Sequence, residues 1–104
     1  MSRPWHFRHR TAQARLDLLN IWNYIAERNF DAADKVRDEL YDAFGRLADM
    51  PGLGHTREDL ADKRHRFWSV PPDVIMYRPE TRPLQIVMIV HGARDLRALL
   101  GHDE

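Results

Sequence analysis

The sequence predicts an α+β fold in which a helical hairpin packs on one face of a small, mostly antiparallel sheet. Residues 12–28 and 31–49 place apolar side chains with the 3.6-residue period of helices. Residues 66–90 change to the two-residue period of strands, and prolines interrupt them at the turns. The chain has 104 residues, near the most common size of one domain, so residues 1–104 are expected to form a single domain.

A strand and a long helix are expected at the start of the chain. Residues 5–9 alternate apolar and polar side chains, which indicates a half-buried strand. Thr11 suits a helix N-cap, because its hydroxyl can accept a hydrogen bond from a free amide of the first turn. The helix then carries a wide apolar stripe formed by Leu16, Leu18, Leu19, Trp22 and Ile25. A stripe of this width predicts burial on more than one side of the helix.

The second helix is expected from Asp31 to about Asp49. Asp31 is a good N-cap, and Asp34 places a carboxylate near the positive helix end. The apolar face consists of Ala33, Val36, Leu40, Phe44 and Leu47. Pro51 and Gly52 end the helix. The short link between the two helices implies that they are antiparallel.

The remainder reads as a loop followed by three strands. The loop is predicted over residues 52–65, and the strands over residues 66–70, 74–78 and 84–90. Pro71, Pro72 and Asp73 form the first turn, since proline cannot donate to a strand ladder. The last strand is apolar on both faces, which favours a central position in the sheet. The predicted order is therefore β-α-α-β-β-β.

The composition excludes several classes of protein. Sixteen basic and sixteen acidic residues cancel, whereas a general nucleic-acid binder usually has a basic excess. We therefore expect no direct sequence-specific binding of nucleic acid. No cysteine is present, so disulfides and cysteine zinc sites are excluded, and a reducing cytoplasm fits. No apolar stretch reaches the roughly 18 residues of a membrane span.

Three strand motifs and two helix segments carry a resemblance to a known family. Arg66 and Phe67 open a strand, VIMYR at residues 74–78 forms the next, and HGARDL follows the last. With LLNIWNYIAERNFDAADKVRDEL and LADMPGLG in the helical part, they resemble the ParE branch of the RelE/ParE toxin superfamily. The resemblance extends from about residue 5 to 100. Pro71 and Pro72 depart from it, because relatives usually carry a glycine and an aromatic residue there.

The resemblance implies a toxin of a bacterial type II toxin–antitoxin system, with a RelE/ParE-like fold. Such a toxin is held inactive by a small cognate antitoxin, here expected to be ParD-like, in a hetero-oligomer. ParE-like toxins are held to inhibit DNA gyrase, whereas RelE-like relatives cleave messenger RNA on the ribosome. A third possibility is a chain without toxicity that acts as a co-repressor with its antitoxin.

The segment from His91 to Asp95 has a structural interpretation. Gly92 lets the chain turn sharply after the strand. Asp95 can cap a short helix that begins near Leu96 and covers one end of the core. Arg94 can bond loop carbonyls or pair with a carboxylate. The same segment also suits contact with a partner.

An RNA-cleaving site is the catalytic interpretation of the same segment. Cleavage needs a base, a proton donor and cations for the phosphate. His91 could be the base or acid, while Arg94 and Arg66 could hold the phosphate. RelE-like nucleases, however, place a reactive tyrosine beyond the last strand, and residues 94–104 contain none. The structural interpretation is therefore favoured, and no catalytic residue is expected.

Aromatic and basic residues are the candidates for contact with a partner protein. Trp22, with Tyr24 and Tyr41, could form an aromatic platform or belong to the core. Trp68 follows Phe67 in a strand, so one of the two must face away from the core. The candidate partner-binding residues are Trp22, Lys63, Arg64, Arg66, Trp68, Arg94 and Leu96. The antitoxin is expected to lay an amphipathic helix in the groove between hairpin and sheet.

The six histidines do not predict a metal site. His6 and His9 lie three apart in the predicted strand, so their side chains point to opposite faces. His55, His65 and the remaining two show no spacing typical of metal ligands. We therefore expect neither a metal nor another cofactor.

Overall fold

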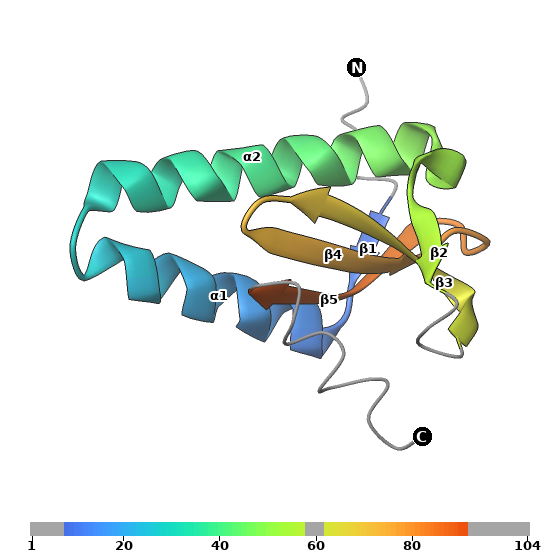
Figure 1. Cartoon of the computed structure of the whole chain (residues 1–104), viewed down its shortest axis with the longest axis horizontal. Coiled ribbons are helices and arrows are strands. Elements are labelled where there is room, and N and C mark those ends of the chain that lie inside the picture. The colour runs from blue at the N-terminus through green and yellow to red at the C-terminus, as the bar shows by residue number, and fades with distance from the viewer. Residues whose placement is uncertain (1–7, 58–61, 92–104) are drawn as a thin grey trace.

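The computed structural model describes residues 8–57 and 62–91 (Figure 1). Its elements are β1 (Arg8–Arg10), α1 (Ala12–Ala26), α2 (Phe30–Asp49), the 3-10 turn η2 (Pro51–Leu53), β2 (His55–Arg57), β3 (Asp62–Val70), β4 (Asp73–Arg78) and β5 (Leu84–His91). The two helices are antiparallel and joined by a short turn (Figure 1). The predicted α+β class and helical hairpin are confirmed.

The strands form a five-stranded sheet in the order β1-β5-β4-β3-β2. β1 pairs with β5 in parallel, and the other neighbours are antiparallel, which confirms a mostly antiparallel sheet. β5 lies between β1 and β4, so it is not an edge strand, but the central position predicted for it is occupied by β4. The parallel pairing of β1 with β5 brings the start of the described chain beside its last strand.

Thr11 caps α1 and also links it to the sheet. Its hydroxyl oxygen accepts from the amide of Ala14 at 3.0 Å, which confirms the predicted N-cap. The same hydroxyl donates to the carbonyl of Val87 in β5 at 2.6 Å. Of the strand predicted over residues 5–9, residues 5–7 lie outside the described chain, and β1 continues to Arg10.

The N-cap of α2 is Asn29, so the prediction that Asp31 is this N-cap is wrong. The Asn29 side-chain oxygen accepts from the amide of Ala32 at 2.9 Å, and its backbone is extended with a φ of −160°. Asp31 already lies in the first helical turn, where its carboxylate still favours the helix dipole. The turn between the helices lies earlier in the chain than predicted, since α1 ends at Ala26 and α2 starts at Phe30.

The main core lies between the helices and one face of the sheet. Its largest fully buried members include Tyr77, Phe44, Leu40, Leu47, Ile75, Leu84 and Ile86. The apolar face predicted for α2 is confirmed, because Ala33, Leu40, Phe44 and Leu47 are buried and Val36 packs against them. The hairpin therefore covers the sheet with one continuous apolar layer.

The apolar stripe of α1 is buried on one side only. Leu18 is buried, but Leu16 and Leu19 are 51% and 54% exposed. Two positions correspond to about 200° around a helix, so Leu16 faces away from Leu18. The prediction of burial on more than one side of α1 is therefore wrong, and these two leucines lie on the surface.

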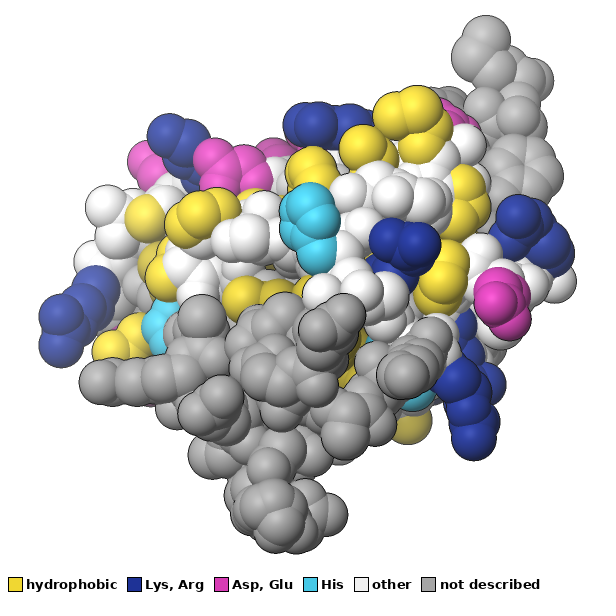
Figure 2. Space-filling model, turned by 45° about the vertical axis from the view of Figure 1, so that its right-hand side comes forward, with side chains coloured by type: hydrophobic (Ala, Val, Ile, Leu, Met, Phe, Trp, Pro, Cys, Tyr) yellow, Lys and Arg dark blue, Asp and Glu magenta, His cyan; other side chains and the backbone are white. Residues whose placement is uncertain are grey.

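A second apolar cluster lies on the other face of the sheet. It consists of Phe67, Val74, Met76 and Val90, with Val87 and Met88 beside them. These residues alternate along β3 and β4 with members of the main core, as strand geometry requires. Outside these clusters, the surface in Figure 2 shows hydrophobic side chains scattered among basic and acidic ones.

The segment predicted to be a loop, residues 52–65, contains strand β2 and the first residues of strand β3. β2 pairs antiparallel with β3, and β3 begins at Asp62 instead of Arg66. Both segments are rich in charged and polar side chains and lack an apolar alternation. An edge strand of this kind is determined by backbone pairing with its neighbour, which a residue pattern does not reveal.

Candidate functional site

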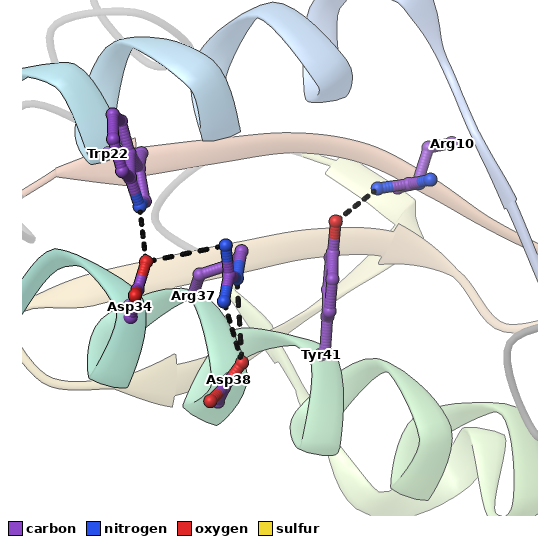
Figure 3. A network of polar contacts seen from close by, with 6 residues as sticks. All are labelled: Arg10, Trp22, Asp34, Arg37, Asp38 and Tyr41. Atoms are coloured by element: carbon purple, nitrogen blue, oxygen red, sulfur yellow. Dashed lines mark hydrogen bonds and ion pairs between the residues drawn. The ribbon is translucent and has the colours of Figure 1, made fainter. Parts of the chain in front are cut away.

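A hollow of about 320 Å³ lies between α1 and α2, near the end of β1. Its apolar lining consists of Leu18, Leu19, Trp22 and Tyr41. Its basic lining consists of Arg10, Arg15 and Arg37. Residues of three elements therefore meet in one surface that combines aromatic rings with guanidinium groups, and Figure 3 shows part of it.

One end of the hollow is a polar network of two carboxylates, one guanidinium and an indole. The indole Nε1 of Trp22 donates to Oδ1 of Asp34 at 3.0 Å. Nη1 of Arg37 lies 3.4 Å from the same oxygen, an ion pair between positions i and i+3 of α2. Nε of Arg37 also lies 3.4 Å from Oδ1 of Asp38 (Figure 3). Two carboxylates thus surround one guanidinium and leave an excess of negative charge at this end, and Asp34 fixes the orientation of the Trp22 ring.

The other end of the hollow carries uncompensated positive charge. The guanidinium of Arg10 lies 5.5 Å from the centre of the Tyr41 ring, and its Nη1 is 3.4 Å from the Tyr41 hydroxyl. Nη1 of Arg15 donates to the carbonyl oxygen of Arg10 at 2.7 Å. Among the described residues, no carboxylate is paired with Arg10 or Arg15. This end therefore attracts a negatively charged group.

The predicted aromatic platform is only partly assembled. Trp22 and Tyr41 both line the hollow, and Trp22 is half-buried. Tyr24 is 63% exposed and lies instead beside His91, with 6.0 Å between ring centres. Trp22 thus belongs neither to the deep core nor to a fully open surface.

Trp68 and Phe67 point to opposite faces of the sheet, as predicted. Phe67 faces away from the helices and is buried in the second cluster. Trp68 is half-buried against the main core and stacks on His55 with 6.4 Å between ring centres. The aromatic residue that turns away from the helices is therefore Phe67, and Trp68 keeps one partly open side.

The basic candidates occupy different environments. Arg64 is exposed on β3, whereas Arg66 is half-buried and its Nη1 donates to the carbonyl of Gly54 at 2.7 Å. Lys63 belongs to β3, but its side chain lies outside the described residues. The segment predicted to turn and form a closing helix, which holds Gly92, Arg94, Asp95 and Leu96, also lies outside them.

Tyr77 joins Arg66 and Gly54 in a buried node below the η2 turn. Its hydroxyl accepts from the Gly54 amide at 2.8 Å and donates to the Pro51 carbonyl at 2.6 Å. Burial raises the pKa of the Tyr77 hydroxyl, although the Gly54 amide and the nearby Arg66 charge act in the opposite direction. The node therefore keeps Arg66 engaged with the backbone of its own chain.

His91 is bound to Asp73, a buried carboxylate that sequence reasoning missed. The two residues face each other across β4 and β5, and Nδ1 of His91 lies 2.7 Å from Oδ1 of Asp73. Asp73 is 1% exposed, whereas the His91 side chain is half-exposed. Burial raises the pKa of Asp73, and the hydrogen bond and charge of His91 counteract this only in part. The strand register that creates the pair cannot be read from residue types.

The strand register separates His91 from Arg66. Arg66 is opposite Tyr77, whereas His91 is opposite Asp73, four residues away along β4. At about 3.3 Å per residue, the two positions are roughly 13 Å apart. The described chain thus does not bring these two residues together in one site. It also contains no group of three or more His, Cys, Asp or Glu that could hold a metal ion.

The comparisons with known proteins assign the family. No curated protein matches the chain. In the described residues, no helix is both long and apolar enough to cross a membrane. Residues 9–96, which include both helices and all strands after β1, match the family described as the ParE toxin of the type II toxin-antitoxin system parDE. The chain belongs to the ParE toxin family of type II toxin–antitoxin systems.

Proposed function

We propose that this toxin inhibits DNA gyrase and that a ParD-like antitoxin neutralises it by direct binding. Membership of the ParE family is the observation that supports this, and it implies a cognate antitoxin as partner. Inhibition of gyrase would place the protein in the cytoplasm, in agreement with the absence of cysteine.

A binding toxin, rather than an enzyme, fits the arrangement of the candidate catalytic residues. Cleavage of RNA needs a base, an acid and a phosphate-binding cation around one phosphodiester group. Arg66 is bonded to the backbone of Gly54 and lies far from His91 by strand register. The proposed mechanism is therefore docking on gyrase, which stabilises an enzyme–DNA intermediate without chemistry by the toxin.

The antitoxin is proposed to dock as an amphipathic segment on the hairpin. Leu19 exposes apolar surface on α1 and lines the hollow together with Trp22 and Tyr41. Anchors of a helix at i, i+3 or i+4 suit a surface of this kind. The proposed site thus lies between the two helices and is an alternative to the groove between hairpin and sheet.

A supercoiling assay with purified gyrase tests the proposed target. Addition of the toxin should reduce supercoiling of relaxed DNA and trap cleaved DNA. Trp68→Ala and Arg64→Ala should weaken the effect, because these residues are proposed to contact gyrase. Lys35→Ala, exposed on α2, is the matched control. Unimpaired supercoiling and no trapped cleavage at a large excess of toxin would reject the proposal.

A ribosome-dependent endoribonuclease is the second candidate, because the buried Asp73 orients His91 while the imidazole stays half-exposed. Primer extension on messenger RNA after induction distinguishes the two functions. Codon-phased cuts that disappear in His91→Ala would favour the nuclease. Absence of growth arrest without antitoxin would instead favour a co-repressor.

A further inference from the structure

We infer that Arg10 and Arg15 form a carboxylate-binding pair at the open end of the hollow. The segment that occupies the hollow would then carry an acidic side chain next to an apolar one. The inference rests on the proposed function, since it specifies the chemistry of the antitoxin segment. On this inference, Arg10 and Arg15 distinguish partner segments with an acidic side chain from segments without one.

Both arginines are held in place without losing their charge. Arg10 is fixed over the Tyr41 ring at 5.5 Å, and Arg15 is fixed by its bond to the Arg10 carbonyl. A guanidinium offers five N–H donors, of which Arg15 uses one on the Arg10 carbonyl and Arg10 uses one on the Tyr41 hydroxyl. The planar arrangement of the remaining donors matches the two oxygens of a carboxylate. The pair is thus ordered before the partner arrives.

The distribution of charge gives the occupant an orientation. Asp34 and Asp38 outweigh the charge of Arg37 at one end of the hollow, whereas Arg10 and Arg15 have no carboxylate partner among the described residues. The carboxylate of the occupant would therefore lie at the β1 end. Its apolar side chain would lie over Leu19 and Trp22.

The same charges favour a peptide over a nucleic acid. The hollow measures about 320 Å³, at the small end of the roughly 300–1,000 Å³ typical of ligand pockets, so it suits a few side chains. A nucleic-acid backbone carries regularly spaced phosphates, and Asp34 and Asp38 would repel those beside them. Leu19, which is 54% exposed, offers apolar surface on α1 at the hollow, where a helical segment could pack. An acidic, amphipathic peptide is the occupant that fits all these features.

Matched synthetic peptides test the inference directly. Three helical peptides of about 15 residues share one leucine face and differ only in the flanking positions, which hold Glu, Gln or Lys. Each is titrated into the ¹⁵N-labelled full chain, with the Trp22 indole N–H as reporter. We expect the Glu peptide to shift this signal and to bind about tenfold more tightly than the Gln peptide. No saturable binding, or equal binding of all three, would overturn the inference.

Charge-swapped variants separate recognition from loss of folding. Arg10→Gln with Arg15→Gln should remove the preference for Glu, whereas the control Arg28→Gln, exposed beyond the end of α1, should retain it. Arg10→Glu with Arg15→Glu should bind the Lys peptide instead, a gain that misfolding cannot produce. If the swapped variant still prefers the Glu peptide, the pair does not bind the carboxylate.

The peptide assay tests the carboxylate-binding pair and the gyrase assay tests the proposed target, so either claim can be refuted without the other. A toxin that binds the Glu peptide but leaves gyrase unaffected would refute the proposed target and support the carboxylate-binding pair. A toxin that inhibits gyrase but shows no preference among the peptides would support the proposed target and refute the carboxylate-binding pair.

Discussion

Gly54 is the residue at which a single added carbon should disturb the fold most clearly. A Cβ there would lie 2.6 Å from the Tyr77 hydroxyl oxygen and 2.8 Å from the Phe67 carbonyl oxygen. The Phe67 carbonyl is backbone and cannot move away cheaply. Gly54→Ala should therefore lower the free energy of unfolding by about 1–3 kcal/mol, as overpacking does.

Urea denaturation of the purified variants provides the measurement for Gly54. Gly52→Ala is the matched control, because nothing lies within 4 Å of the position its Cβ would take. Its stability should stay within about 0.5 kcal/mol of the parent chain. Equal effects of the two substitutions would show that the close approach at Gly54 does not control stability.

The buried Asp73 should make stability depend on pH. Its pKa in the folded chain is raised above the ordinary 3.8, first by burial, with His91 acting in the opposite direction. The folded state thus holds the proton more tightly than the unfolded chain. This contribution is complete below pH 3.8 and is lost as pH rises through the folded pKa.

Asp73→Asn provides the comparison, because it removes the titrating proton. Urea unfolding of both proteins between about pH 3.5 and 6.5 should show the parent chain losing stability relative to the variant as pH rises. Parallel curves would mean that Asp73 does not titrate differently in the two states.

At the scale of elements, the N-cap of α2 gives a direct test. Asn29 accepts from the Ala32 amide, whereas Asp31 lies within the first turn. Asn29→Ala should cost about 1 kcal/mol of stability, the usual value for loss of a capping side chain. Asp31→Ala should cost less, roughly 0.3–1 kcal/mol from the helix dipole. Thermal unfolding ranks the two, and the reverse ranking would contradict the cap.

Elements with a strong local signal are predictable from the sequence. The apolar period of α2 and the hydroxyl of Thr11 each determine a local structure, and both are confirmed. Asn29 and Asp31 are equally good caps in isolation, so only the tight turn between the helices distinguishes them. β2 depends on pairing with β3 and leaves no apolar pattern in its own residues.

The candidate site is less predictable than the elements that build it. Trp22 can be identified as an aromatic residue of interest, but Arg10 and Tyr41 meet across 31 positions of sequence. Asp73 and His91 likewise meet through a strand register that turn geometry determines. Residue types predict which side chains could bind a partner, and tertiary packing decides which of them meet.

For the whole molecule, association with the antitoxin should appear as added stability. A partner that binds only the folded toxin stabilises it by about 2.7 kcal/mol when present at 100 times its Kd. The product of the adjacent open reading frame should therefore raise the Tm of the toxin in calorimetry, and more so at higher concentration. An unchanged Tm at saturating concentration would contradict direct neutralisation.

The pairing of β1 with β5 has a consequence for how the protein is made. The Thr11 hydroxyl donates to the carbonyl of Val87, 76 positions later. During synthesis, β1 can therefore pair with β5 only after β5 has been translated. Arg10 lies at the end of β1 and reaches its final place only with this closure. A nascent toxin on the ribosome would thus lack the proposed carboxylate-binding pair until translation is nearly complete, because Arg10 would not yet be in place beside Arg15.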